Sequence, residues 1–349
     1  MPIFDHLDGV LKSGVRQVSE GPWSVISDNW PSATLCMTNP YLFIVGCPRS
    51  GTTLLQRIVN AHPQIAITPE SHWIPHLYEK PWALSPEGLI EHKLVRELGA
   101  HPKFARLGIS RQELKRLEKL ARNGQPLTYS RLVTTLLDLY GKAHGKPLVG
   151  DKTPDYVRRI STLHGLWPEA RFVHVIRDGR DVCLSMRDWP KVHPKPGDFT
   201  TWKDDPVSTA AWWWGINVRL GRDAGRSLTP GLYYELRYET LVARPQEQCE
   251  LLCAFLGVPF NEAMLRFHEG QTRPDPGLEQ KRAGLPVTPG LRDWQSQMAA
   301  EELEQFEAAG GELLDELNYP RAVPDPRTEA LEHAAGVRRL LAHDPRARD

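Results

Sequence analysis

Short strand-like runs recur along the chain, and most of the segments between them have the spacing of amphipathic helices. The runs lie at residues 41–45, 65–67, 148–154, 171–178 and 232–238. Helices are expected at residues 52–61, 87–98, 111–121, 130–140, 179–187, 208–222, 245–256, 299–309 and 312–317. Apolar runs that alternate with helices are typical of buried parallel strands. The pattern therefore predicts an α/β fold in which a doubly wound parallel sheet has helices on both faces.

The same pattern predicts one large domain, at residues 41–320, with a shorter segment on each side. Residues 74–146 are polar and helical and lack a strand of the central sheet, which favours a helical insertion on the substrate side. Residues 1–40 are expected to form an arm packed on the domain, and 321–349 a charged tail that is either a surface helix or loose chain. A loop at 273–293, rich in proline, glycine and basic residues, is longer than a compact fold normally carries without a function.

The first strand runs into a loop with the composition of an anion site. Residues 46–53 read Gly-Cys-Pro-Arg-Ser-Gly-Thr-Thr, and a helix is expected from Thr52. Backbone N–H groups at a helix start have no helical acceptor, and the helix dipole adds about half a positive charge there, so phosphate and sulfate are natural ligands. The P-loop of nucleotide triphosphatases has a lysine before its hydroxyl residue, Thr53 here, but Thr52 holds the lysine position and the cation is Arg49. The missing lysine disfavours ATP hydrolysis.

A second anion signal follows the fourth strand. Arg177 ends that strand, and Ser185 lies about two helical turns into the next element. Open α/β sheets bind ligands beyond the carboxyl ends of their strands, so both side chains are expected near the loop at 46–53. The alternative is that Arg177 makes a structural ion pair with Asp178 or Asp181.

Composition narrows the possible partners and compartments. Lysine plus arginine equals aspartate plus glutamate at 43 each, so the net charge gives no long-range attraction to nucleic acid or to an anionic membrane. No apolar run approaches the ~20 residues that span a bilayer. The start of the chain does not resemble a secretion signal, and the five cysteines form no pair of Cys-x-x-Cys motifs, so we expect a cytoplasmic protein with reduced thiols and no metal site.

Four separated stretches resemble the sulfotransferases that use 3′-phosphoadenylyl sulfate (PAPS), in the form found in bacterial and tyrosylprotein sulfotransferases. They are Pro-Arg-Ser-Gly-Thr-Thr at 48–53, the segment with Arg177 and Ser185, Tyr-Glu-Thr-Leu at 238–241, and the basic loop that ends at Trp294. The resemblance implies a P-loop-type sheet and a late loop that covers the cofactor. It implies that the nucleotide is bound by Arg49, Ser50, Gly51, Thr52, Thr53, Arg177, Ser185, Tyr238, Lys281 and Arg282.

The resemblance also implies catalytic roles. Arg49 would neutralise the departing phosphate, and Lys152, at a strand end, would polarise the sulfuryl oxygens. Glu70 is the favoured base for the acceptor's proton, with His72 as the rival. The run at 212–214 cannot place all three tryptophans on one side of a helix, so one or two are expected in the core.

The sequence therefore predicts a sulfotransferase that moves a sulfuryl group from PAPS to a hydroxyl, releases adenosine 3′,5′-bisphosphate (PAP) and needs no metal. A small molecule is the favoured acceptor, and a sugar, a lipid and a peptide tyrosine remain open. The alternatives are a P-loop nucleotide or nucleoside-phosphate kinase and a non-catalytic nucleotide-binding protein. Oligomeric state is left open.

Overall fold

The computed structural model describes residues 38–123, 126–188, 199–269 and 292–344. The arm expected at 1–40 falls, but for its last three residues, outside the described part of the chain, and so do Lys281 and Arg282 of the late loop.

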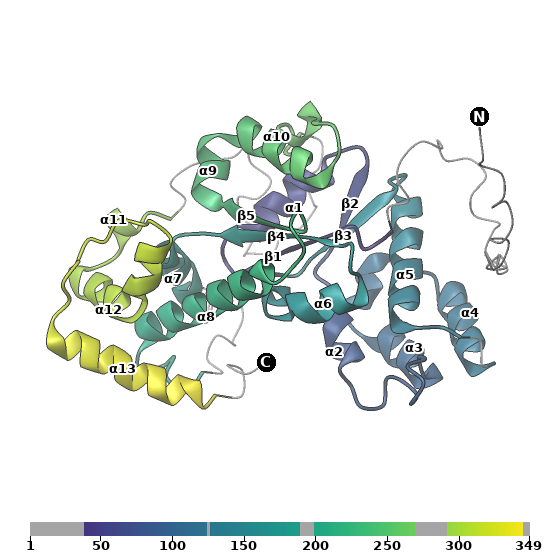
Figure 1. The fold of residues 1–349 in the computed structure, drawn as a ribbon, viewed down its shortest axis with the longest axis horizontal. Helices are drawn as coiled ribbons and strands as arrows, with labels where there is room; N and C mark the ends of the chain where they lie inside the picture. Colours follow the sequence, from purple (N-terminus) through teal and green to yellow (C-terminus); the bar gives the residue numbers. More distant parts are fainter. Residues whose placement is uncertain (1–37, 124–125, 189–198, 270–291, 345–349) are drawn as a thin grey trace, which may run out of the picture. The chain divides into compact units, whose positions relative to one another are not determined.

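A parallel five-stranded sheet forms the centre of the described residues, in the order β2-β3-β1-β4-β5 (Figure 1). Its strands are β1 (Leu42–Gly46), β2 (Ile65–Thr68), β3 (Leu148–Lys152), β4 (Arg171–Ile176) and β5 (Tyr233–Arg237). Strands β1 to β4 are buried almost throughout, which explains their apolar runs. The predicted α/β fold with a parallel sheet is confirmed.

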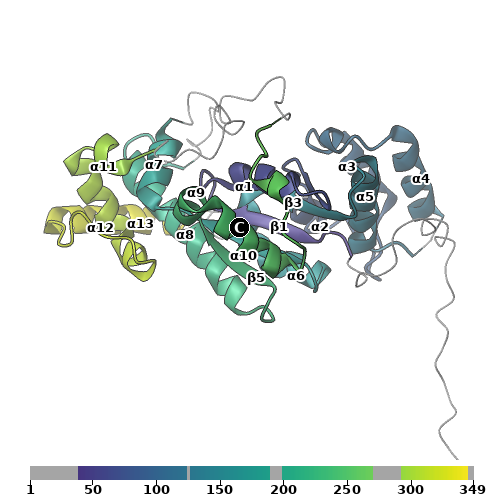
Figure 2. The same ribbon diagram turned by 90° about the horizontal axis from the view of Figure 1, so that it is seen from above.

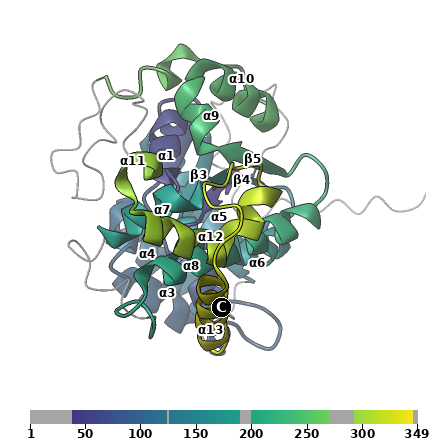
Figure 3. The same cartoon turned by 90° about the vertical axis from the view of Figure 1, so that its left-hand side faces the viewer.

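Helices cover both faces of this sheet. On one face lie α1 (Thr52–Asn60), α9 (Tyr238–Ala243) and α10 (Pro245–Leu256); on the other lie α6 (Ile160–Leu166) and α8 (Pro206–Arg226) (Figures 1 and 3). Phe43 of β1 shows how the second face is packed. Its ring stacks on Phe172 of β4 at 5.4 Å between centroids and meets the edge of Tyr156 at 6.4 Å. Tyr156 belongs to the short helix η3 (Pro154–Arg159), which follows β3 directly.

The segment 74–146 is helical and adds no strand to the sheet, as predicted. It contains α2 (Ile74–Tyr78), α3 (His92–Ala100), η2 (Phe104–Leu107), α4 (Arg111–Arg122) and α5 (Tyr129–Ala143). Figure 2 shows α3, α4 and α5 gathered at the β2–β3 side. The helix predicted at 87–98 begins only at His92, because the chain before it turns at Gly88 and makes isolated antiparallel bridges.

The helices after residue 292 pack beside α7 (Gly179–Arg187) and α8. They are α11 (Trp294–Gln297), α12 (Ala300–Glu316) and α13 (Thr328–Ala342). The residues predicted as helices at 299–309 and 312–317 are helical to within one residue at the outer ends, but the predicted break between them is wrong, since α12 runs through both. The helix continues through Gly310 because α12 packs along α8: Phe306 lies 5.9 Å from Trp214 of α8 between ring centroids, and Leu313 and Leu314 are buried. In the segment expected as a charged tail, α13 buries Val337 and Leu341.

The remaining long helices lie where the sequence places them. The expected bounds of α1, α4, α5, α7, α8 and α10 agree with the structure to within four residues at each end. On α8, Trp213 and Trp214 are buried and Trp212 is partly exposed, which confirms that one or two of the three fill the core. Within the described ranges, no helix is both long enough and apolar enough to cross a bilayer.

Candidate active site

The candidate residues lie at, or just after, the carboxyl ends of all five strands. Strand register aligns Ile44 with Lys152 and Gly46 with Val175, so the ends of β1, β3 and β4 meet at one edge of the sheet. Because parallel strands share this edge, the loop after β1, the turn after β2 and the first residues after β4 and β5 converge there. The sheet thus gathers motifs that are far apart in the sequence.

Two glycines and a left-handed arginine shape the loop after β1. A Cβ on Gly46 would lie 2.5 Å from the carbonyl oxygen of Val175. Gly51 is the N-cap residue before α1 and has φ of 92°, and a Cβ on it would lie 2.3 Å from the ring of Tyr238. Arg49 has φ of 77°, an uncommon value for a residue with a side chain. The backbone is therefore held in a tight turn that presents the first N–H groups of α1, which have no helical acceptor.

Arg49 joins this loop to α7. Its Nε donates a hydrogen bond of 3.0 Å to Oγ of Ser185. Two residues that the sequence assigned to separate anion signals therefore touch, and the structure brings the two signals into one site.

Arg177 follows the carboxyl end of β4 and is buried to 6% exposure. Its Nη2 donates to Asp181 at 3.0 Å, and its guanidinium lies 4.3 Å from the ring centroid of Tyr238. The expected ion pair with an aspartate is thus present, while Asp178 pairs with Arg180. Nε of Arg177, however, is buried without an acceptor among the described residues. A buried guanidinium with an unused donor is costly unless a ligand completes its hydrogen bonds.

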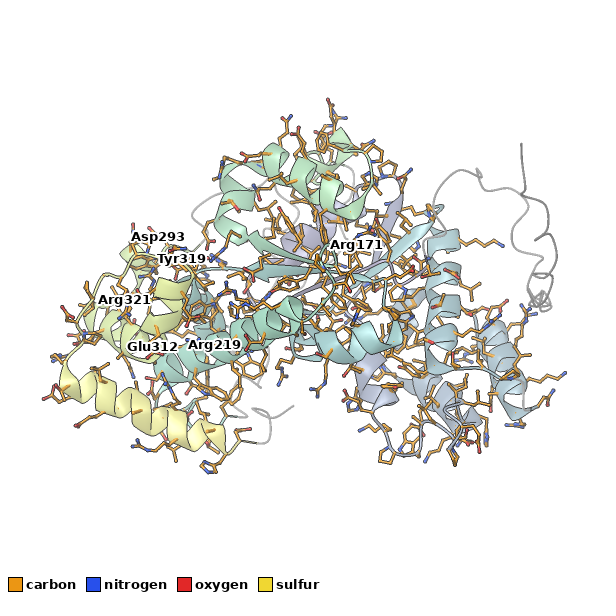
Figure 4. All side chains as sticks on the ribbon, viewed as in Figure 1. Arg171, Arg219, Asp293, Glu312, Tyr319 and Arg321 are labelled. Carbon is orange, nitrogen blue, oxygen red and sulfur yellow. The ribbon has the colours of Figure 1, made fainter. Side chains whose placement is uncertain are left out.

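Surrounding residues fix Arg177 in this position. Burial raises the pKa of Asp181, and the nearby Arg177 opposes that shift. The indole N–H of Trp214 donates to the Arg177 carbonyl at 3.0 Å. Glu239 accepts from the backbone N–H of Asp178 and from the hydroxyl of Tyr319, which Figure 4 labels beside the helices after residue 292.

Lys152 connects the loop to the turn after β2. Its buried ammonium donates to Oγ1 of Thr53 at 3.3 Å and also to a carboxylate oxygen of Glu70. His72 Nε2 lies 3.1 Å from the other oxygen of Glu70. Burial alone would raise the pKa of Glu70, but the hydrogen bond to His72 and the charge of Lys152 outweigh it and hold that pKa well below its ordinary value.

The sequence missed several features of the site. Tyr238 was expected in the last strand, but it begins α9, where its ring can cover Gly51. The clamp that holds the turn after β2 was also missed: Ser71 bonds through its N–H to Thr153 Oγ1 at 3.0 Å and through its hydroxyl to Tyr156 at 2.6 Å. Ser71, Thr153 and Tyr156 belong to no motif that marks them as partners, so only the structure reveals these contacts.

A family model and curated relatives match most of this chain. A family model described as "Sulfotransferase family" matches residues 40–262. Protein-tyrosine sulfotransferase of Drosophila melanogaster is 28% identical over 240 residues, which cover 68% of this chain and 42% of that protein. Nodulation protein NoeE of Sinorhizobium fredii is 28% identical over 312 residues, which cover 82% of this chain and 67% of that protein.

Solved structures agree on the fold. The sulfotransferase domain of the Synechococcus PCC 7002 olefin synthase gives a TM-score of 0.52 at 22% identity, covering 88% of this chain and 98% of that domain. The chain spans about half the length of the curated protein-tyrosine sulfotransferases it matches, for example 42% of the fly protein and 56% of one from Danio rerio.

Proposed function

This chain belongs to the sulfotransferase family, and from that membership we propose that it moves the sulfuryl group of PAPS to an acceptor hydroxyl. The products are a sulfate ester and PAP. The observation that carries the proposal is the joined pair of anion sites: the loop residue Arg49 bonds to Ser185, and the ring of Tyr238 lies between Gly51 of the loop and the buried Arg177.

The residues present fit a nucleotide with phosphates at both the 5′ and 3′ positions. Oγ of Ser50 in the loop and Nε of Arg177 are both buried without a partner among the described residues, so each has a hydrogen bond to offer a ligand. In the proposed complex the loop binds the 5′-phosphosulfate, and Arg177 with Ser185 binds the 3′-phosphate. Tyr238, packed between Gly51 and Arg177, lies close to both groups and would border the adenosine.

The cations around the loop favour sulfuryl transfer over a kinase reaction. A P-loop kinase places its lysine inside the loop and uses the following hydroxyl to bind magnesium. Here the lysine is Lys152, which reaches the loop from β3 through Thr53. A cation held beside the loop can polarise the sulfuryl oxygens without a metal.

The transfer exchanges one bond at sulfur for another, shifts negative charge onto the phosphate and releases a proton from the acceptor. The bond between sulfur and the bridging phosphate oxygen breaks, and a bond forms between sulfur and the acceptor oxygen. Arg49 and the N–H groups of the loop stabilise the charge left on the phosphate, while Lys152 stabilises charge on the sulfuryl oxygens. The acceptor's proton passes to a base as its oxygen attacks.

Glu70 is the proposed base, and His72 supports it. The Nε2 atom of His72 is engaged with Glu70, which places the carboxylate between the imidazole and Lys152. When Lys152 turns to the sulfuryl group, Glu70 loses part of the interaction that lowers its pKa and becomes a stronger base. Bound PAPS would thereby make Glu70 a stronger base for the transfer of the PAPS sulfuryl group.

Nucleotide binding tests the proposal directly. Isothermal titration with PAP, adenosine 5′-phosphate and magnesium ATP should give 1:1 binding of PAP without metal, with adenosine 5′-phosphate weaker. Binding or turnover of magnesium ATP, together with no binding of PAP, would instead support a kinase.

A further inference from the structure

Asp155 lies next to the proposed transfer site but has no part in the mechanism above. It is the second residue of η3, three residues after Lys152, and its carboxylate lies 3.9 Å from Nδ1 of His72. Burial raises the pKa of Asp155. The charges of His72, Arg158 and Lys152 oppose this rise, and the charge of Glu70 adds to it. Asp155 therefore belongs to the same charge cluster as the proposed base.

The turn that carries His72 is held against the segment that carries Asp155. His72 has φ of 56°, a left-handed value that costs about 1–3 kcal/mol in a residue with a side chain. The turn persists because its neighbours are fixed: Ser71 bonds to Thr153 and Tyr156, and the Ile74 N–H donates to the same Tyr156 hydroxyl at 3.0 Å. Thr153 and Tyr156 flank Asp155, so the two side chains face each other from rigid supports.

The Asp155 carboxylate is open to a ligand. Solvent reaches 39% of its side chain and 33% of that of His72, although burial is sufficient to raise the carboxyl pKa. The exposed fraction and the raised pKa both fit a carboxylate that protein surrounds on several sides and that solvent reaches on one side. The 3.9 Å separation from His72 is too long for a hydrogen bond, and no described residue donates one to this carboxylate.

The nearby cations Lys152 and Arg158 lower the pKa of Asp155 through their charge, but no hydrogen bond from either of these described side chains to its carboxylate is present. Lys152 donates to Glu70 and Thr53. The guanidinium of Arg158 lies 4.8 Å from the ring centroid of Trp213. An acceptor that covered Asp155 with an apolar group would bury a carboxylate that has no hydrogen-bond donor among the described residues, which is costly, whereas a cationic group could donate one to it.

We propose that Asp155 selects the acceptor by binding a protonated amine on it, while the acceptor hydroxyl lies at Glu70 and Lys152. The acceptor class is therefore a phenol or alcohol that also carries an ammonium group. This inference rests on the proposed function, because it assumes that the hydroxyl reacts beside Glu70.

Matched phenols test the proposal. Tyramine and 4-(aminomethyl)phenol carry the amine, and 4-ethylphenol and p-cresol are neutral counterparts of similar size. With PAPS as donor, the wild-type ratio of kcat/KM for amine over neutral phenol should be about tenfold or more, since a charge-assisted hydrogen bond changes affinity by roughly ten to 150-fold. Asp155→Asn should bring the ratio close to one, and Asp155→Glu should retain part of the preference.

Controls separate this inference from the proposed function. Asp223→Asn removes an exposed carboxylate on α8 and should leave the ratio unchanged. Thermal unfolding and PAP affinity of each variant show whether it is folded and binds nucleotide. If the wild type does not bind PAP, the proposed function fails and the inference fails with it. If PAP binds but amine phenols are not sulfated, or the ratio is unchanged in Asp155→Asn, Asp155 has no selective role and the proposed function stands.

Discussion

Replacement of Arg177 should separate nucleotides by their 3′-phosphate. Arg177 is buried to 6% exposure, and its Nε has no partner among the described residues, so it is the donor best placed for that phosphate. A hydrogen bond between charged groups contributes about 1.5–3 kcal/mol, which is roughly ten to 150-fold in affinity. Arg177→Met should therefore weaken PAP by this factor and adenosine 5′-phosphate by less than about threefold.

The same substitution breaks a buried ion pair, so folding must be controlled. Loss of one partner of such a pair costs about 3–5 kcal/mol because the other charge stays buried and unpaired. The double variant Arg177→Met/Asp181→Asn removes both charges and should recover part of the lost stability in urea unfolding. Its PAP affinity should stay low.

Calorimetry of both variants against the two nucleotides gives the result. A loss confined to PAP supports the assignment. Equal losses for PAP and adenosine 5′-phosphate, in variants that unfold cooperatively, would show that Arg177 supports the fold and does not bind the 3′-phosphate.

Three further substitutions probe the base, the loop and the packing around α7. Because the pKa of Glu70 lies below the ordinary carboxyl value, Glu70 stays ionised at and above that value, so kcat/KM should stay level from pH 8 to about 5. Glu70→Gln should lower kcat at least about a hundredfold. A decline of kcat/KM near pH 6.5 would indicate an imidazole base. Gly51→Ala should weaken the binding of PAP strongly, whereas Gly88→Ala, which is also at positive φ but faces open space, should not. Equal PAP affinity in the two variants would show that the loop at 46–53 does not bind the nucleotide. Arg180→Met leaves the buried carboxylates of Asp178 and Glu307 unpaired and should cost about 3–5 kcal/mol in chemical denaturation, against less than about 1 kcal/mol for Arg226→Met, which breaks an exposed pair. Similar costs would show that burial of the Arg180 ion pairs does not set their contribution to stability.

The parts of the fold that local sequence determines could be predicted. Strand, loop and helix start follow one another within residues 41–61, so β1 and α1 could be predicted from the apolar run, the turn at 46–51 and the helical composition after it. Arg177 and Ser185 were also predictable, because a strand end and a position two turns into the next helix return to the same edge of the sheet.

The remaining features depend on contacts between distant segments. Lys152 and Glu70 are 82 residues apart, and their pairing follows from the adjacency of β2 and β3. The left-handed turn at His72 depends on Tyr156, which no pattern marks as its partner. The error at Gly310 has the same origin: the packing of α12 on α8 outweighs the low helix propensity of glycine.

The most direct test of the central claim is sulfuryl transfer itself. The wild-type protein is incubated with PAPS and a panel of hydroxyl acceptors in the presence of EDTA, and the products are identified by mass spectrometry. We predict a sulfate ester and an equal amount of PAP from the wild type, and a loss of both in Arg49→Ala, which removes the cation proposed to neutralise the departing phosphate. Equal product formation by Arg49→Ala, or turnover of magnesium ATP with no sulfated product from any acceptor, would contradict the account.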